Sequence, residues 1–202
     1  VSTTGFKKQR AVFEDLLYQT MRQPGAQSGQ ATQIPNGVQL GVGVQVISTA
    51  RDFTQGSLQQ TGSAFDVAIN GKCFFQILMP DGTTAYTRNG AFHQDSQGQL
   101  VTANGYAIQP AITVPSDTLE LTISKDGVVS AKQPGNPPQV NQLGQLQLVN
   151  FVNPGGLQSV GENLFVETPS SGAPLTANPG QNGLGSLQQS FLEVSNVNVA
   201  EE

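Results

Sequence analysis

The sequence predicts an all-β fold, an antiparallel β-sandwich or barrel-like domain with a partly ordered N-terminal arm. The first observation is a strict alternation over residues 38–46, where Val or Leu alternates with Gln or Gly. A period of two is typical of a β-strand. The second is a set of turn dipeptides that tolerate positive φ: Asn70-Gly71, Asp81-Gly82, Asn89-Gly90, Asn104-Gly105 and Asp126-Gly127. Short strands separated by such turns indicate antiparallel sheets.

Short apolar runs supply the strands of this domain. They lie at residues 67–69, 74–78, 85–88, 100–102, 106–109, 112–114, 119–123, 128–130, 143–151 and 164–167. Two proline- and glycine-rich segments, 133–142 and 168–185, are predicted to lie outside central strands, because proline lacks the backbone donor of the ladder.

The two ends of the chain have a different character. Residues 8–21 are the best helix candidate, because apolar side chains recur at helical spacing and Pro24-Gly25 would end the run. A strand, or an arm that becomes ordered on assembly, is the alternative, since short isolated helices are marginal in water. Residues 23–37 are too polar to offset the entropy of ordering and are expected to be mobile in a free monomer. Residues 187–202 either start a helix capped by Ser195 or Asn196 or form an extended arm.

Composition excludes several classes of function. The net charge is −5 and the chain has only 11% charged residues, which argues against a nucleic-acid partner. The single cysteine cannot form an internal disulfide, and no run approaches the roughly 20 apolar residues of a membrane-spanning helix. The chain contains 25 Gln, so its surface is built mainly from uncharged amides. Val1 in place of Met leads us to expect a fragment of a longer protein.

No group of residues forms a coherent catalytic or metal site. His93 is the only histidine, so it cannot build a histidine-rich zinc site; a general base beside Asp95 is the functional alternative to an exposed hairpin residue. Cys73 begins an apolar run and is expected to be buried, the alternative being a thiolate activated by Lys72. The carboxylates at Asp52, Asp66, Asp81, Asp95, Asp117 and Asp126 lie mostly beside turns. We therefore predict no enzyme activity, cofactor, metal or small-molecule substrate.

Two other classes of function stay open at this point. One is a carbohydrate-binding or adhesive β-module, against which the absence of Trp counts. The other is a β-fold hydrolase, which would require two of the carboxylates, or His93, to meet in a cleft.

Several segments resemble the flagellar rod and hook protein family. Residues 1–7 (VSTTGFK) are similar to the sequence that closes the family's N-terminal helix, and 192–199 (LEVSNVNV) to the one that opens its C-terminal helix. Three internal segments continue the resemblance: DVAING at 66–71 followed by Phe74-Phe75, YTRNGAF at 86–92, and GQLV at 98–101. The family commonly has glycine where Cys73 stands.

The resemblance implies a structural role in a polymer. Residues 10–19 and 24–27 resemble the distal-rod branch of the family, and the hook branch lacks an insert spanning about 18–39. This implies an arm at 1–39, a β-rich outer-wall domain at 40–190, and a segment at 191–202 that leads into a missing helix. A proximal-rod or hook member is the alternative. The implied subunit-contact residues of the arm are Phe13, Leu16, Leu17, Tyr18, Arg22 and Ile34.

The same resemblance implies partners and a location. The partners are further copies of the chain in a helical polymer, the proximal rod protein, the hook protein, the P-ring and L-ring proteins, and the flagellar type III export apparatus. The location is the basal body, in a rod that spans periplasm to outer membrane, reached by export without a cleaved signal peptide.

Overall fold

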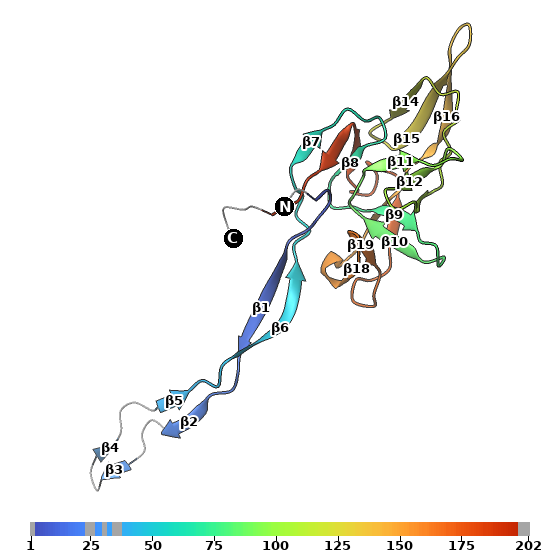
Figure 1. Cartoon of the computed structure of the whole chain (residues 1–202). Helices are drawn as coiled ribbons and strands as arrows, with labels where there is room; N and C mark the ends of the chain where they lie inside the picture. Colours follow the sequence, from blue (N-terminus) through green and yellow to red (C-terminus); the bar gives the residue numbers. More distant parts are fainter. Residues whose placement is uncertain (1–2, 23–26, 30–31, 34–37, 198–202) are drawn as a thin grey trace. The chain divides into compact units, whose positions relative to one another are not determined.

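The structure is a computed structural model that describes residues 3–22, 27–29, 32–33 and 38–197 (Figure 1). The chain forms two compact units: unit 1 comprises Val1–Lys8 with Asp52–Glu202, and unit 2 is Gln9–Arg51. These bounds differ from the predicted division after residue 39, because the returning strand of the arm extends to Arg51 and the first eight residues pack within unit 1. In the described part of the chain no helix is long and apolar enough to cross a membrane.

Unit 2 is a series of nested antiparallel pairs (Figure 1). Strand β1 (Gln9–Asp15) pairs with β6 (Val44–Arg51), β2 (Gln19–Arg22) with β5 (Val38–Leu40), and β3 (Gln27–Gly29) with β4 (Thr32–Gln33).

The helix predicted over residues 8–21 is wrong, and the strand alternative is what the structure contains. An amphipathic helix gains most of its stability by burying one face, and the described residues of unit 2 offer no core for that face. The partner strands β5 and β6 instead satisfy the backbone of β1 and β2.

Unit 1 is built around one antiparallel seven-stranded sheet. Its strand order is β11 (Phe92–Gln94), β12 (Leu100–Thr102), β13 (Ala107–Gln109), β9 (Phe75–Leu78), β10 (Thr84–Thr87), β19 (Leu164–Val166) and β18 (Gln158–Gly161). A three-stranded sheet follows the order β14 (Glu120–Ile123), β15 (Val128–Gln133) and β16 (Gln139–Gln145). The all-β prediction is confirmed.

Three antiparallel pairs complete unit 1. They are β17 (Leu148–Asn150) with β20 (Leu175–Ala177), β21 (Ser186–Gln189) with β8 (Val67–Asn70), and β22 (Phe191–Glu193) with β7 (Leu58–Gln60). A single turn of 3-10 helix, η1, covers Pro154–Gly156. Residues 186–189 and 191–193 of the C-terminal segment are therefore extended, because β8 and β7 supply backbone partners for them. A helix capped by Ser195 or Asn196 would lie mainly over residues 198–202, which are outside the described residues.

Several predicted boundaries shift for identifiable reasons. The run at 143–151 is split between β16 and β17, and 112–114 contributes only an isolated bridge from Thr113 to Gln99. The prolines of both segments lie outside central strands, since residues 134–138 form the turn between β15 and β16, and β16 and β20 both lie at sheet edges. Gln133, predicted to lie outside central strands, ends the central strand β15. Residues 139–142, predicted as loop, belong to β16, where a sheet edge needs only one partner.

The core of unit 1 is apolar and closely packed. Val67, Ile69, Phe75 and Ile77 are fully buried in the larger cluster. A second cluster holds Val149 and four aromatic residues, Phe74, Tyr86, Phe151 and Phe165. Neighbouring rings of this cluster meet edge to face with centroids 4.8–6.1 Å apart. Edge-to-face packing adds to the burial of such rings. The hydrophobic effect therefore accounts for the stability of unit 1.

Candidate assembly site

Apolar side chains stand exposed on both strands of the β1–β6 ribbon. Phe13 on β1 lies directly opposite Val46 on β6, and they are 62% and 56% exposed. Val44 lies two residues further along the same face, because side chains of a strand alternate between faces. Monomeric proteins rarely leave a contiguous apolar strip in water, so this face indicates contact with another protein surface.

The predicted residues Leu16, Leu17 and Tyr18 lie together at the end of β1. They line a hollow of about 350 Å³ with Glu14, Asp15 and Gln45. Leu17 is 91% exposed, and the ring of Tyr18 covers Gly41, where an added Cβ would lie 3.2 Å from Tyr18 Cε1. The Tyr18 hydroxyl donates a hydrogen bond to the Asp15 carboxylate, which raises the pKa of the phenol.

Arg22 and Ile34 are the other two predicted contact residues of the arm. Arg22 ends β2, where its backbone pairs with Val38. Ile34 lies outside the described residues. Four of the six predicted contact residues are thus brought together on one ribbon end, and their role in subunit contact stays a prediction.

A buried charge cluster joins the two terminal segments of unit 1. The Glu193 carboxylate on β22 accepts hydrogen bonds from Lys7 Nζ, from Gly56 N–H at 2.8 Å, and from Arg88 Nε and Nη2 at 2.8 and 2.6 Å. The side chains of Lys7, Arg88 and Glu193 are at most 1% exposed. Burial lowers the pKa of Lys7, opposed by its hydrogen bond to Glu193.

Backbone contacts reinforce this cluster. Gly5 N–H donates to Glu193 O at 2.8 Å, and Lys8 N–H donates to Asn196 Oδ1 at 2.8 Å. The Asn196 side-chain amide donates in turn to Asp52 O at 2.9 Å. An added Cβ on Gly56 would lie 2.0 Å from Val194 O, so the backbones approach too closely for any other residue. We call this set, Gly5–Lys8 with Asp52–Ser57, Arg88 and Glu193–Asn196, the terminal junction.

Sequence reasoning missed the terminal junction. Neither Lys7 nor Glu193 has a predicted role of its own. Lys7 and Glu193 are 186 positions apart, so no local pattern relates them. One sequence feature pointed to these residues: Arg88, Lys7 and Glu193 all fall inside segments that carry the family resemblance.

Residues considered for catalysis take structural roles. His93 is exposed on β11, as expected for a hairpin residue. Cys73 is 1% exposed, accepts a hydrogen bond from Gly185 N–H at 3.5 Å, and its thiol pKa is raised by burial, which opposes thiolate formation. Asp52, Asp81 and Asp95 accept backbone N–H bonds two residues ahead, the turn-capping role predicted for them. Within the described residues no group of three or more His, Cys, Asp or Glu could hold a metal ion.

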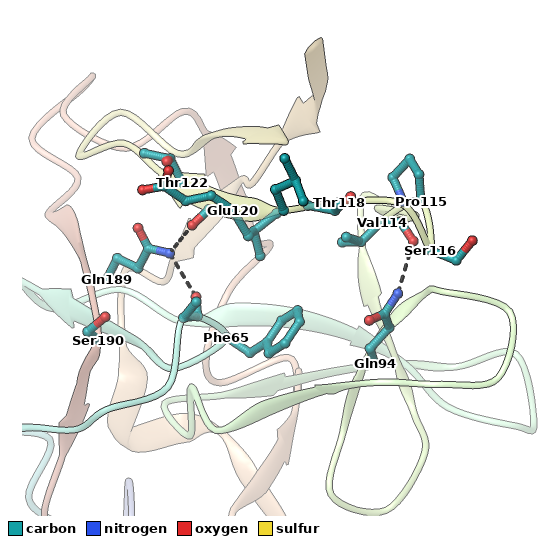
Figure 2. A pocket seen from close by; sticks show the side chains of 13 residues that line it. Phe65, Gln94, Val114, Pro115, Ser116, Thr118, Glu120, Thr122, Gln189 and Ser190 are labelled. Atoms are coloured by element: carbon teal, nitrogen blue, oxygen red, sulfur yellow. Dashed lines mark hydrogen bonds between the residues drawn. The ribbon is translucent and has the colours of Figure 1, made fainter. Parts of the chain in front are cut away.

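A hollow with a volume of about 620 Å³ lies in unit 1 between β11, β14 and β21 (Figure 2). Figure 2 shows its two amide side chains turned to backbone carbonyls: Gln94 donates to Val114 O at 2.9 Å, and Gln189 to Ala64 O and Leu121 O at 2.8 Å. Glu120, the carboxylate among its lining residues, pairs with Lys132 at 3.5 Å. The two amides of this hollow therefore tie neighbouring elements together, whereas the buried hydroxyl of Thr118 in its lining has no hydrogen-bond partner in the described part of the chain.

Comparison with known proteins identifies flagellar relatives of this chain. The family model described as flagellar hook protein FlgE/F/G D1 domain matches residues 68–131, from β8 to β15. The flagellar basal-body rod protein FlgG of Buchnera aphidicola subsp. Schizaphis graminum is 54% identical over 202 residues, which are 100% of this chain and 77% of that protein. The protein of that name from Caulobacter vibrioides is 49% identical over 203 residues, with the same coverage.

The chain belongs to the FlgG family of flagellar basal-body rod proteins. It is therefore a structural subunit of the flagellar rod. The flagellar hook protein FlgE of Helicobacter mustelae is 44% identical over 116 residues, which cover 54% of this chain and 24% of that protein. A hook-type member is not favoured, because the rod proteins match along the whole chain and this hook protein matches only part of it.

Proposed function

We propose that the chain is a subunit of the distal rod that polymerises into a rigid, hollow driveshaft and transmits torque to the hook. The observation that supports this most directly is the β1–β6 ribbon, whose Phe13, Val44 and Val46 are 56–67% exposed. A two-stranded ribbon without a buried face is at best marginally stable alone. Contact with neighbouring subunits would bury these side chains and satisfy the open strand edges.

In this proposal the two units have different tasks. Unit 1 forms the wall of the tube, since its core is complete within one chain. Unit 2 bridges to other copies through Phe13, Leu16, Leu17, Tyr18, Arg22 and Ile34. The partners are further copies of the chain, the proximal rod and hook proteins, and the P-ring and L-ring proteins. Delivery is by the flagellar type III export apparatus, and the subunit carries out no catalysis.

Deleting residues 18–37 in the full-length protein tests the bridging role. We expect unit 1 to keep its cooperative thermal unfolding, because none of its strands pairs with the deleted segment. Electron microscopy of isolated basal bodies should then show rods that are curved or flexible. Straight rods, or a deletion protein in which unit 1 no longer folds, would contradict the proposal.

A pair of substitutions in the same ribbon sharpens the test. Phe13→Ser removes an exposed apolar side chain, whereas Gln9→Ser changes an exposed polar residue of the same strand, outside the hollow lined by Leu16, Leu17 and Tyr18. Phe13→Ser should weaken rod stiffness or motility in soft agar, and Gln9→Ser should leave both unchanged. Equal effects of the two substitutions would count against a role of the apolar face.

A further inference from the structure

The terminal junction is held by polar groups, in contrast to the rest of unit 1. Glu193 is the anion that faces two buried cations, Lys7 and Arg88. Arg88 also donates to the backbone carbonyls of Gly71 at 2.6 Å and Cys73 at 2.7 Å, which anchors its guanidinium independently of Glu193. Apolar packing in the junction comes from Phe53, whose ring meets Phe74 and Phe165 edge to face, whereas Phe191, Leu192 and Val194 are only half-buried.

A buried charge cluster is stable only when each charge has its partner, and an incomplete cluster destabilises the folded state. Removing one partner of a buried ion pair leaves an uncompensated charge in a low-dielectric environment. Without Glu193, two cations would face each other with no anion between them. The junction therefore has two states, closed with the carboxylate in place and open with the terminal segments released.

The contacts of the junction include the largest sequence separations among the hydrogen bonds described in unit 1. Lys7 and Glu193 are 186 positions apart, Lys8 and Asn196 are 188 apart, and Gly56 and Glu193 are 137 apart. The strand pairs β9–β10, β12–β13 and β14–β15 instead join neighbours along the chain. Closing a longer loop costs more conformational entropy, so local hairpins form first and the junction forms late.

We propose that the terminal junction is an assembly latch: the last part of unit 1 to close, and the part whose closure pairs the two terminal segments for polymerisation. This inference rests on the proposed function, in which the subunit is delivered through the flagellar type III export apparatus. Until residues 193–196 arrive, Lys7 and Arg88 have no Glu193 carboxylate, Gly5 N–H has no acceptor on β22, and Lys8 N–H lacks Asn196 Oδ1. An incompletely delivered subunit would thus not present paired ends.

Hydrogen exchange in the full-length monomer tests the latch. The reporters for the latch are the amides of Gly5, Gly56 and Val194, which donate to Glu193 O, Glu193 Oε1 and Ser57 O. The reporters for the core are the amides of Phe74 and Val149, which bond each other's carbonyls. We expect the three latch amides to exchange together, and faster than the two core amides.

Glu193→Gln should accelerate exchange at the latch amides about 100-fold or more, the factor that corresponds to breaking a buried ion pair, and leave the core amides unchanged. Glu120→Gln, which alters the exposed pair with Lys132, is the control and should change neither set. If wild-type latch and core amides exchange at one common rate, the latch is overturned.

A milder variant keeps the test decisive if Glu193→Gln unfolds the whole unit. Asn196→Ala removes the acceptor of Lys8 N–H and the donor to Asp52 O, and should accelerate the latch amides alone by roughly tenfold. Equal acceleration of the core amides would overturn the proposal.

The assembly role is measured separately in cells. Full-length Glu193→Gln protein should be present at normal amounts but absent from isolated rods, and normal incorporation would overturn the assembly role. If the wild-type protein itself is not found in rods, the proposed function fails, whereas the monomer exchange result still stands or falls on its own.

Discussion

The strands of unit 2 and those of the sheet in unit 1 differ in what they bury. Strand β9 of unit 1 has Phe75 and Ile77 at 0% exposure, whereas β6 of unit 2 has Val44 and Val46 at 67% and 56%. Both strands alternate apolar and polar residues. The alternation therefore predicts the conformation of a strand, while burial depends on whether other elements cover its apolar face.

The largest test of this comparison is the loss of one aromatic side chain in each region. Phe75→Ala should lower the free energy of unfolding of unit 1 by about 3–5 kcal/mol, since it leaves a cavity in a closed core. Phe13→Ala should change the stability of the monomer by less than about 0.5 kcal/mol, as expected for an exposed site. Urea denaturation of the two variants measures both, and comparable losses would mean that the ribbon has a core of its own.

The same contrast explains how much of the fold was predictable. Positions such as 67–69, 74–78 and 100–102 were identified as strands because a repeated local pattern and a nearby turn agree. The short strands β7, β11 and β18 carry no such pattern, since they have three or four residues and few apolar side chains. The segment 8–21 carries a helical spacing of apolar residues, and only its distant partners β5 and β6 decide for the strand alternative.

Predictability of the candidate site divides in the same way. The arm residues were predicted through the family resemblance, and Phe13, Leu17 and Tyr18 are exposed on the ribbon. Lys7 and Glu193 were not identified, because their pairing depends on chain closure over 186 positions. Charged residues near chain ends are normally solvated, so composition pointed away from a buried cluster.

A second test of the comparison uses the titration of a buried charge. Since burial lowers the pKa of Lys7 below its ordinary value of 10.5, the folded state releases this proton before the unfolded state does. The unfolded state then binds more protons below pH 10.5, so the contribution of Lys7 to the free energy of unfolding rises as the pH rises towards that value. The slope cannot exceed about 1.4 kcal/mol per pH unit for one proton.

The difference in unfolding free energy between wild type and Lys7→Met, measured by urea denaturation from pH 7 to 10.5, isolates this group. The free energy of unfolding of the wild type should rise relative to that of Lys7→Met as the pH increases. Arg10→Met in the exposed part of β1 is the control and should give a difference that is independent of pH, because arginine keeps its charge. If the free energy of unfolding of the wild type instead falls relative to that of Lys7→Met as the pH rises, the junction raises the pKa of Lys7.

The smallest expected effect compares one tyrosine from each region. The pKa of Tyr86 is raised chiefly by burial, and its ring is 2% exposed with a centroid 4.8 Å from that of Phe151. The pKa of Tyr18 is raised chiefly by its hydrogen bond to Asp15, although Tyr18 is 54% exposed. Charge effects between exposed groups are screened by salt, whereas desolvation is not. NMR titration in 1 M salt should therefore bring the Tyr18 pKa closer to its ordinary value and leave that of Tyr86 raised.

Asp15→Asn isolates the effect of the Asp15 carboxylate on the pKa of Tyr18 from the effect of the rest of the ribbon. It should lower the pKa of Tyr18 without changing the pKa of Tyr86 or the free energy of unfolding of unit 1, since Asp15 belongs to unit 2. A Tyr18 pKa that stays raised in this variant and in high salt would mean that its phenol is desolvated. The ribbon end at Leu16–Tyr18 would then already be covered in the monomer, and the apolar surface proposed for subunit contact would be smaller than the exposure of Leu17 and Tyr18 indicates.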